Sequence, residues 1–122
     1  MRISLLTLIL TVSMKVQANE ADVISASAEH IGGTFFRFEV TVQHHDESWE
    51  HFVKAWEVLD DEGTVLGARI LAHPHVKEQP FTRFHTINIP EEVHEVRIRA
   101  YDLVHQYGGK EITLKLNKGN QK

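Results

Sequence analysis

The sequence contains no cysteine, and its two methionines, Met1 and Met14, both lie near the N-terminus. The lack of thiols excludes disulfide bonds, cysteine-ligated zinc, iron–sulfur clusters and thiol catalysis. The sequence also lacks a glycine-rich phosphate loop and the G-x-S-x-G and H-E-x-x-H motifs of hydrolases. We therefore identify no catalytic residues from the sequence, and any bound metal must be held by nitrogen and oxygen atoms.

Long apolar runs are equally scarce, because the only one lies at the start of the chain. Ile3–Val12 is a short apolar stretch that follows the basic Arg2 and precedes the small or branched residues of Val16–Ala18. This order is typical of a secretory signal peptide, and the stretch is too short to span a membrane as a helix. We expect residues 1–18 to be a signal peptide and residues 19–122 to form one exported domain, periplasmic or secreted.

The expected mature domain is acidic. Loss of Arg2 and Lys15 with the signal leaves 11 basic against 17 acidic residues, a formal net charge of −6. Such a charge disfavours nucleic acid and anionic membrane surfaces as partners. We therefore expect no nucleic-acid binding and no membrane insertion after cleavage.

The rest of the chain alternates between apolar and polar residues with the two-residue period of half-buried β-strands, most clearly over Phe36–Gln43 and Val96–Tyr101. Turn residues such as Gly32-Gly33 separate seven such segments, and Asp60–Gly63 closes a hairpin between the third and the fourth. We expect the first four strands at about 22–30, 34–43, 51–59 and 64–71, the fifth to end at Pro90, and the last two to flank Gly108-Gly109. This pattern predicts an all-β, seven-stranded, immunoglobulin- or fibronectin III-like sandwich with Trp56 buried, and a small closed barrel is the alternative.

Nine histidines in 122 residues are several times the usual share. In a seven-stranded sandwich the chain reverses at every turn, so alternate connections emerge at the same end. The second, fourth and sixth connections hold six of the nine: His44, His45, His51, His73, His75 and His105. The remaining three, His30, His85 and His94, are assigned structural or surface roles.

The local pattern narrows this set. Pro74 stiffens the segment between His73 and His75, and in extended chain residues two apart project to the same side. His44 continues the inward alternation of the strand before it, whereas His45 has the opposite parity and should face solvent. The predicted metal ligands are His44, His51, His73, His75 and His105, of which three or four would bind together. A carboxylate from Asp46, Glu78 or Asp102 is a further candidate ligand.

Residues near these histidines are candidate supports for the site: Asp46, Trp49, Glu78 and Arg83. Arg83 and Gln79 either orient an anionic group or hold the ligands in place, and the alternative for Arg83 is an ion pair with a neighbouring acid. Trp49 lies outside the strand pattern, so it either caps a pocket, presents a contact surface or closes the end of the core.

Two segments of the sequence resemble those of a known group of proteins. The first is His73-Pro74-His75 followed by Glu78–Arg83, and the second is Tyr107–Lys110. The chain resembles small exported bacterial proteins that share an HPH-x-x-EQPFTR segment and a late YGGK segment. The resemblance implies export and a sandwich fold, and it supplies no established activity. The matching positions include the five predicted ligands and the four supports, whereas His45 departs from the pattern.

The sequence favours binding over catalysis. Imidazole ligands suit copper(II) and zinc, and the lack of sulfur argues against a copper(I) carrier. Our first hypothesis is an exported domain that binds copper(II) or zinc for scavenging, delivery or buffering. The second is a metal-free module whose loops recognise a protein, a glycan or another partner in the cell envelope. A small metalloenzyme is the third.

Overall fold

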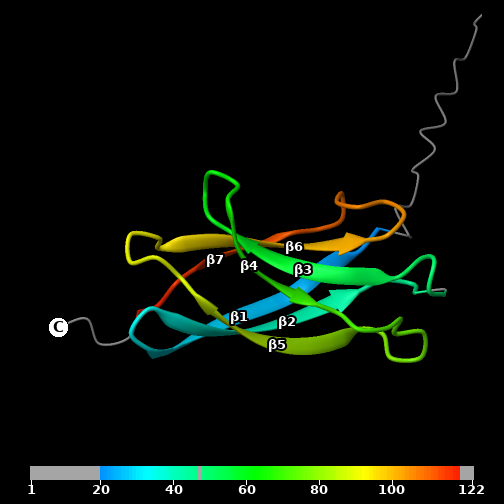
Figure 1. The fold of residues 1–122 in the computed structure, drawn as a ribbon, viewed down its shortest axis with the longest axis horizontal. Helices are drawn as coiled ribbons and strands as arrows, with labels where there is room; N and C mark the ends of the chain where they lie inside the picture. The colour runs from blue at the N-terminus through cyan, green and yellow to red at the C-terminus, as the bar shows by residue number, and fades with distance from the viewer. Residues whose placement is uncertain (1–19, 47, 119–122) are drawn as a thin grey trace, which may run out of the picture.

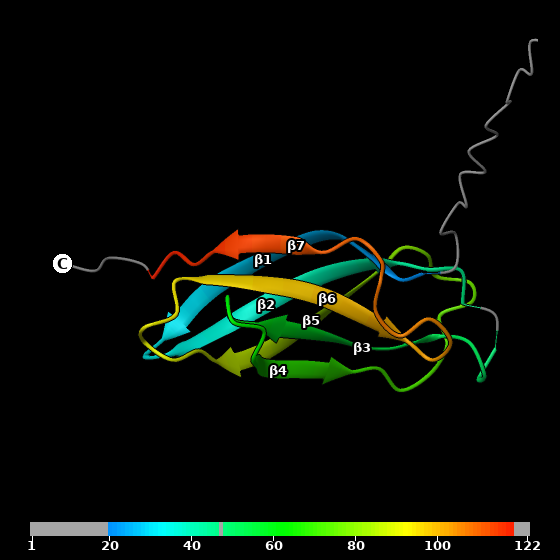
Figure 2. The ribbon, with the colours of Figure 1, turned by 90° about the horizontal axis from the view of Figure 1, so that it is seen from above.

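The computed structural model describes residues 20–46 and 48–118, so the expected signal peptide lies outside the described residues. The strands are β1 (Asp22–Gly32), β2 (Phe35–Gln43), β3 (Val53–Leu59), β4 (Val65–Ile70), β5 (Phe81–Asn88), β6 (Glu95–Asp102) and β7 (Ile112–Lys115). They form two antiparallel sheets in the orders β1-β2-β5 and β4-β3-β6-β7, which face one another (Figures 1 and 2). The predicted seven-stranded β-sandwich is confirmed. In the part of the chain that is described, no helix is long and apolar enough to cross a membrane.

The alternation along the strands builds the core between the two sheets. In β2 the side chains of Phe36, Phe38, Val40 and Val42 are buried, and the residues between them are partly or fully exposed. Trp56 of β3 is fully buried, as predicted, and lies edge-on to the ring of His85 from β5. One face of each sheet thus supplies the apolar layer that holds the sheets together.

The fourth strand does not join the sheet that a constant-type immunoglobulin domain would give it. In that domain it lies with the first, second and fifth strands, whereas here β4 pairs with β3. The short hairpin between them explains the pairing, because the Asp60 carboxylate accepts the N–H groups of Glu62 and Thr64 and Gly63 has a φ of 87°.

The two sheets meet along the edge strands β4 and β5. Gly67 of β4 faces Ile87 of β5, and a Cβ atom at position 67 would lie 2.8–3.0 Å from three Ile87 side-chain carbons. The Arg69 guanidinium donates to the Phe84 carbonyl 3.0 Å away. Glycine therefore permits the closest approach of the sheets on this side.

The connections β2–β3, β4–β5 and β6–β7 emerge at the same end, as predicted, on the right in Figure 1. We call this end the histidine pole and define it by residues 44–46, 48–52, 71–80 and 102–111. His30 and His94 lie at the opposite end, and His85 lies within β5. Segments far apart in the sequence therefore come together at one pole.

The close approach at Gly67 gives a first prediction. Gly67→Ala should lower the free energy of unfolding by about 1–3 kcal/mol, because the added methyl group overlaps Ile87 and must push the sheets apart. Thermal and urea unfolding measure the change. Thr86→Ala, at an exposed position of β5, is the control and should stay within about 0.5 kcal/mol of wild type. Equal stability of the two variants would contradict this packing.

Candidate metal centre

Asp46 connects the segments of the histidine pole. Its Oδ1 atom accepts hydrogen bonds from His44 Nδ1 at 2.5 Å and from the Val53 backbone N–H at 3.2 Å. Its Oδ2 atom accepts the His75 backbone N–H at 2.6 Å. The buried carboxylate thus joins the end of β2, the start of β3 and the β4–β5 loop.

The surroundings of Asp46 fix the orientation of the His44 ring. Burial acts to raise the pKa of Asp46, but the hydrogen bonds from His44 and from the backbone of His75 and Val53 outweigh it, so the pKa lies below its ordinary value. An ionised carboxylate only accepts hydrogen bonds, so His44 donates from Nδ1. A neutral His44 then carries its lone pair on Nε2, as in metal-bound histidines oriented by a carboxylate.

Asp102 lies opposite His44 at the end of β6 and is fully buried. Its Oδ1 atom accepts the backbone N–H groups of Val104 at 2.9 Å and His105 at 2.7 Å. Its Oδ2 atom lies 4.0 Å from His44 Nε2 and has no hydrogen-bond partner among the described residues. A buried oxygen without a hydrogen bond is uncommon, and either a water molecule or a cation would satisfy it.

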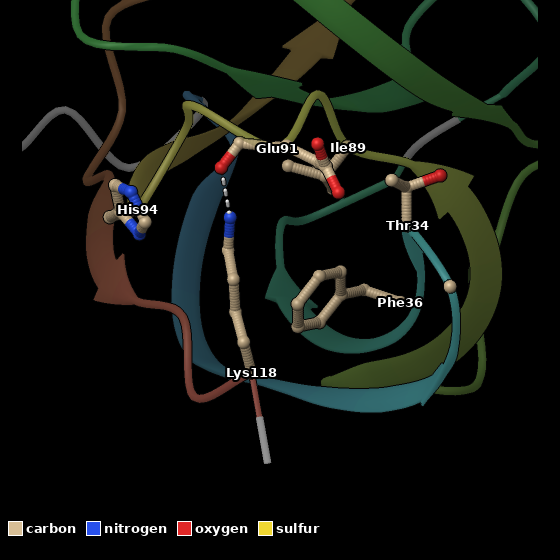
Figure 3. A pocket seen from close by; sticks show the side chains of 7 residues that line it. Thr34, Phe36, Ile89, Glu91, His94 and Lys118 are labelled. Atoms are coloured by element: carbon tan, nitrogen blue, oxygen red, sulfur yellow. Dashed lines mark hydrogen bonds between the residues drawn. The ribbon is translucent and has the colours of Figure 1, made fainter. Parts of the chain in front are cut away.

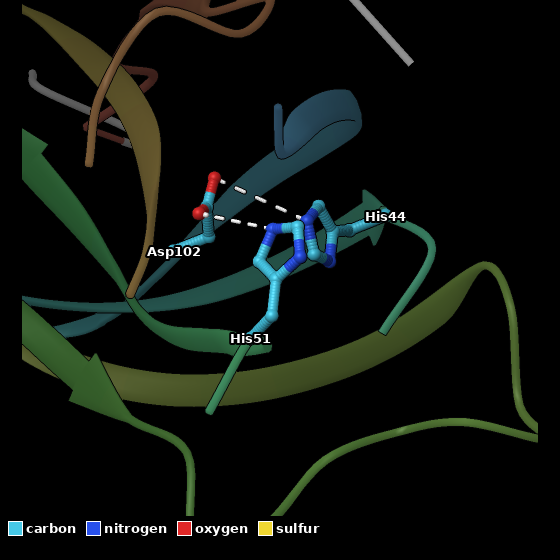
Figure 4. A group of neighbouring side chains, drawn as sticks. All are labelled: His44, His51 and Asp102. Carbon is cyan, nitrogen blue, oxygen red and sulfur yellow. Dashed lines mark ion pairs between the residues drawn. The ribbon is translucent and has the colours of Figure 1, made fainter. Parts of the chain in front are cut away.

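His51 completes a group that could hold a metal ion. Its Nε2 atom lies 3.4 Å from Asp102 Oδ1, and its ring meets the His44 ring edge-on at 4.9 Å between centroids. One donor atom from each of His44, His51 and Asp102 lies within 4.8 Å of the other two (Figure 4). Bonds of about 2.0–2.1 Å to a tetrahedral zinc ion place ligand atoms roughly 3.3 Å apart. These three side chains, which we call the inner cluster, could hold an ion if they moved closer together.

His105 lies beside the inner cluster on its solvent side. Its Nδ1 atom is 3.4 Å from Asp102 Oδ1, its ring centroid is 5.2 Å from that of His51, and its side chain is 34% exposed. This predicted ligand therefore lies next to the inner cluster.

His73 and His75 share the pole but lie on the other side of Asp46. His75 is buried and stacks on Phe81 at 4.0 Å between centroids. Burial, together with the positive charge of Arg83, holds its pKa below the ordinary value. His73 is exposed, and its Nδ1 atom lies 2.9 Å from the Pro74 carbonyl. The five predicted ligands thus meet at one pole but divide into two groups.

The predicted supports differ in their placement. Asp46 contacts His44 directly, whereas Trp49 is 66% exposed and packs edge-on against Phe52. Arg83 forms an ion pair with Glu78 at 3.1 Å, which is the alternative raised for it above. His45 is exposed, as its parity predicts.

Two contributors were only weakly indicated by the sequence. Asp102 was one of three alternative carboxylates, although it shares the inward parity of Val96, Ile98 and Ala100 and could have been singled out on that ground. Gln79 bridges two loops, because its Oε1 atom accepts the His44 N–H at 2.9 Å and its Nε2 atom donates to the His75 carbonyl at 2.8 Å.

The opposite end holds a hollow of a different kind. A cavity of about 260 Å³ lies over the Phe36 ring, with His94 and Lys118 at its sides (Figure 3). The Lys118 ammonium donates to the backbone carbonyl of Glu91 at 2.5 Å. The convergent imidazoles and buried carboxylates lie at the histidine pole instead, so we place the candidate centre there.

Comparison with known proteins adds one clear relative. No family model matches the chain. A protein of Halomicrobium mukohataei named "Putative lipoprotein" is 33% identical over 109 residues, which cover 89% of this chain and 54% of that protein, so the chain spans about half of its length. A superoxide reductase (1Fe-SOR) from Giardia intestinalis aligns in three dimensions with a TM-score of 0.46 and 13% identity, over 78% of this chain and 99% of that chain. A likeness at this TM-score carries no argument about function.

The three hydrogen bonds that Asp46 accepts generate a second prediction. Asp46→Ala should destabilise the metal-free protein by about 3 kcal/mol or more, since it leaves the buried N–H groups of Val53 and His75 without an acceptor. Urea unfolding in the presence of a chelator measures this. His45→Ala, the exposed neighbour, is the control and should be close to wild type. An Asp46→Ala variant as stable as His45→Ala would show that Asp46 does not hold the loops together.

Proposed function

We propose that this protein is an exported domain that binds copper(II) or zinc at the inner cluster, with His105 as a fourth donor. The observation that carries the proposal is the buried Asp102 Oδ2 atom, which faces His44 Nε2 at 4.0 Å without a hydrogen bond of its own. Two acceptor atoms held opposite each other gain most from a cation between them.

The donor set favours particular ions. Two imidazoles and a carboxylate, with a third imidazole nearby, match the ligands of zinc and of copper(II). The described residues offer no sulfur, which copper(I) prefers. The carboxylate of Asp46 behind His44 is the kind of supporting contact that orients a metal-bound imidazole and raises its basicity.

The burial of the cluster favours holding a metal over catalysis at it. His44, His51 and Asp102 are at most 7% exposed, so a substrate would have little access to a bound ion. Scavenging, delivery or buffering of metal in the periplasm or outside the cell fits such a site. Export is supported by the signal-peptide pattern at the N-terminus and by the name of the Halomicrobium mukohataei relative. The shared HPH-x-x-EQPFTR and YGGK segments support a place among small exported bacterial proteins.

A second candidate function is recognition of an envelope protein through the same pole. Large apolar side chains are exposed there, with Trp49 at 66%, Val104 at 56% and Val76 at 54%. The Leu103 N–H donates to the Phe52 carbonyl, which ties the β6–β7 connection to the segment that carries Trp49. Such a surface would suit a partner that donates or accepts the metal.

Calorimetric titration of the untagged protein with zinc and with copper(II) tests the first function. We expect saturable binding tighter than about 10 μM, weakened roughly 10- to 100-fold or more by Asp102→Asn and by His51→Ala. His94→Ala, at the opposite end, is the control and should bind like wild type. Absence of saturable binding, or unchanged affinity in the Asp102→Asn variant, would rule out a metal at the inner cluster.

A further inference from the structure

Asp46 has an imidazole on each side. Its Oδ1 atom holds His44 of the inner cluster, and its Oδ2 atom lies 3.8 Å from Nδ1 of His75 on the outer side. The His73-Pro74-His75 segment contributes no residue to the inner cluster. Its His75 ring therefore lies on the opposite side of the Asp46 carboxylate from His44.

The His75 nitrogen is placed as a metal donor would be. Nδ1 is buried and has no hydrogen-bond partner among the residues that the structure describes. The ring stacks on Phe81 with an angle of 9° between the planes, which holds the plane of the imidazole in place. The separation of 3.8 Å from Asp46 Oδ2 is too long for a hydrogen bond. It is close to the roughly 3.3 Å that separates two donors on one tetrahedral ion.

A third donor is available from solvent. The His73 ring centroid lies 4.7 Å from that of His75, and the side chain of His73 is exposed. Rotation of this exposed ring, away from the Pro74 carbonyl that its Nδ1 atom now contacts, would direct a nitrogen at an ion held by His75 and Asp46.

The charges around His75 act in both directions. Arg83 is paired with Glu78 at 3.1 Å but still acts on His75, because burial and the positive charge of Arg83 hold the pKa of His75 below its ordinary value. The carboxylate of Asp46 is the negative group that a cation beside His75 would contact. Its Oδ2 atom accepts one hydrogen bond, from the His75 N–H, and retains a second lone pair for a metal.

We propose a second metal position, the outer position, formed by Asp46 Oδ2, His75 Nδ1 and the His73 ring, which binds zinc or copper(II). The proposed function supplies the class of ion, but the donors of the two positions are separate. Asp46 ligates the outer ion through Oδ2 while Oδ1 continues to orient His44. Because His73 is exposed, the outer ion exchanges with solvent more readily than the inner one.

Stoichiometry tests the outer position. Native mass spectrometry and zinc titration of the wild-type protein should give two equivalents. His75→Phe retains a ring for stacking on Phe81 and removes the donor nitrogen, so it should bind one equivalent with the inner affinity changed less than about threefold. Asp102→Asn should lose the inner equivalent and keep the outer one. His45→Ala, an exposed neighbour, should bind two.

The outcomes separate the two proposals. If the wild type binds one equivalent of zinc, and His75→Phe still binds it but Asp102→Asn does not, the outer position is overturned and the inner cluster is retained. If the wild type binds one equivalent of zinc, and Asp102→Asn still binds it but His75→Phe does not, the outer position is supported and the inner cluster is overturned. Two equivalents retained in His75→Phe would also overturn the outer position. If His75→Phe does not fold, as judged by circular dichroism, His73→Ala at an exposed position replaces it, with at least a tenfold loss at the outer position expected.

Discussion

The histidine pole depends on the hydrogen bonds that Asp46 accepts from His44 and from the backbone of Val53 and His75. A carboxylate inside a protein is costly unless hydrogen bonds satisfy it. Here the hydrogen bonds come from the end of β2, the start of β3 and the β4–β5 connection. Satisfying the charge therefore fixes the loops, and the fixed loops place the imidazoles. The same contacts orient His44 toward Asp102 and bring His75 to the outer side.

This arrangement explains how a chain without cysteine can build a polar site at the end of an apolar sandwich. Among the residues that the structure describes, the buried polar and charged ones all lie at one pole: His44, Asp46, His51, His75 and Asp102. The core between the sheets is apolar and carries the stability, whereas the buried acids and imidazoles of the described residues gather at the pole. Buried groups of this kind are costly to a fold, and natural proteins keep them mainly at functional sites.

Much of the fold followed from local pattern. Alternation over β2 placed Phe36 and Phe38 inside, and the same parity separated buried His44 from exposed His45. Reversal of the chain at each turn brought three histidine-bearing loops to one end. These features depend on short-range geometry or on strand direction alone. They can therefore be predicted from a single sequence.

The details of the site depend on contacts that no periodicity encodes. The division of the histidines into two groups follows from the path of segment 71–80, which Asp46 and Gln79 fix from another loop. The role of Asp102 depends on a tight turn that returns the N–H groups of Val104 and His105 to its carboxylate. The pairing of β4 with β3, in contrast, follows from the hairpin that the turn residues Asp60–Gly63 predict from the sequence.

The central claim is that a metal ion occupies the inner cluster. A crystal structure of the zinc-loaded protein, with an anomalous difference map collected at the zinc absorption edge, tests this most directly. The account predicts a peak about 2.0–2.2 Å from His44 Nε2, His51 Nε2 and a carboxylate oxygen of Asp102. A fully loaded crystal with no anomalous peak among these three side chains would contradict it.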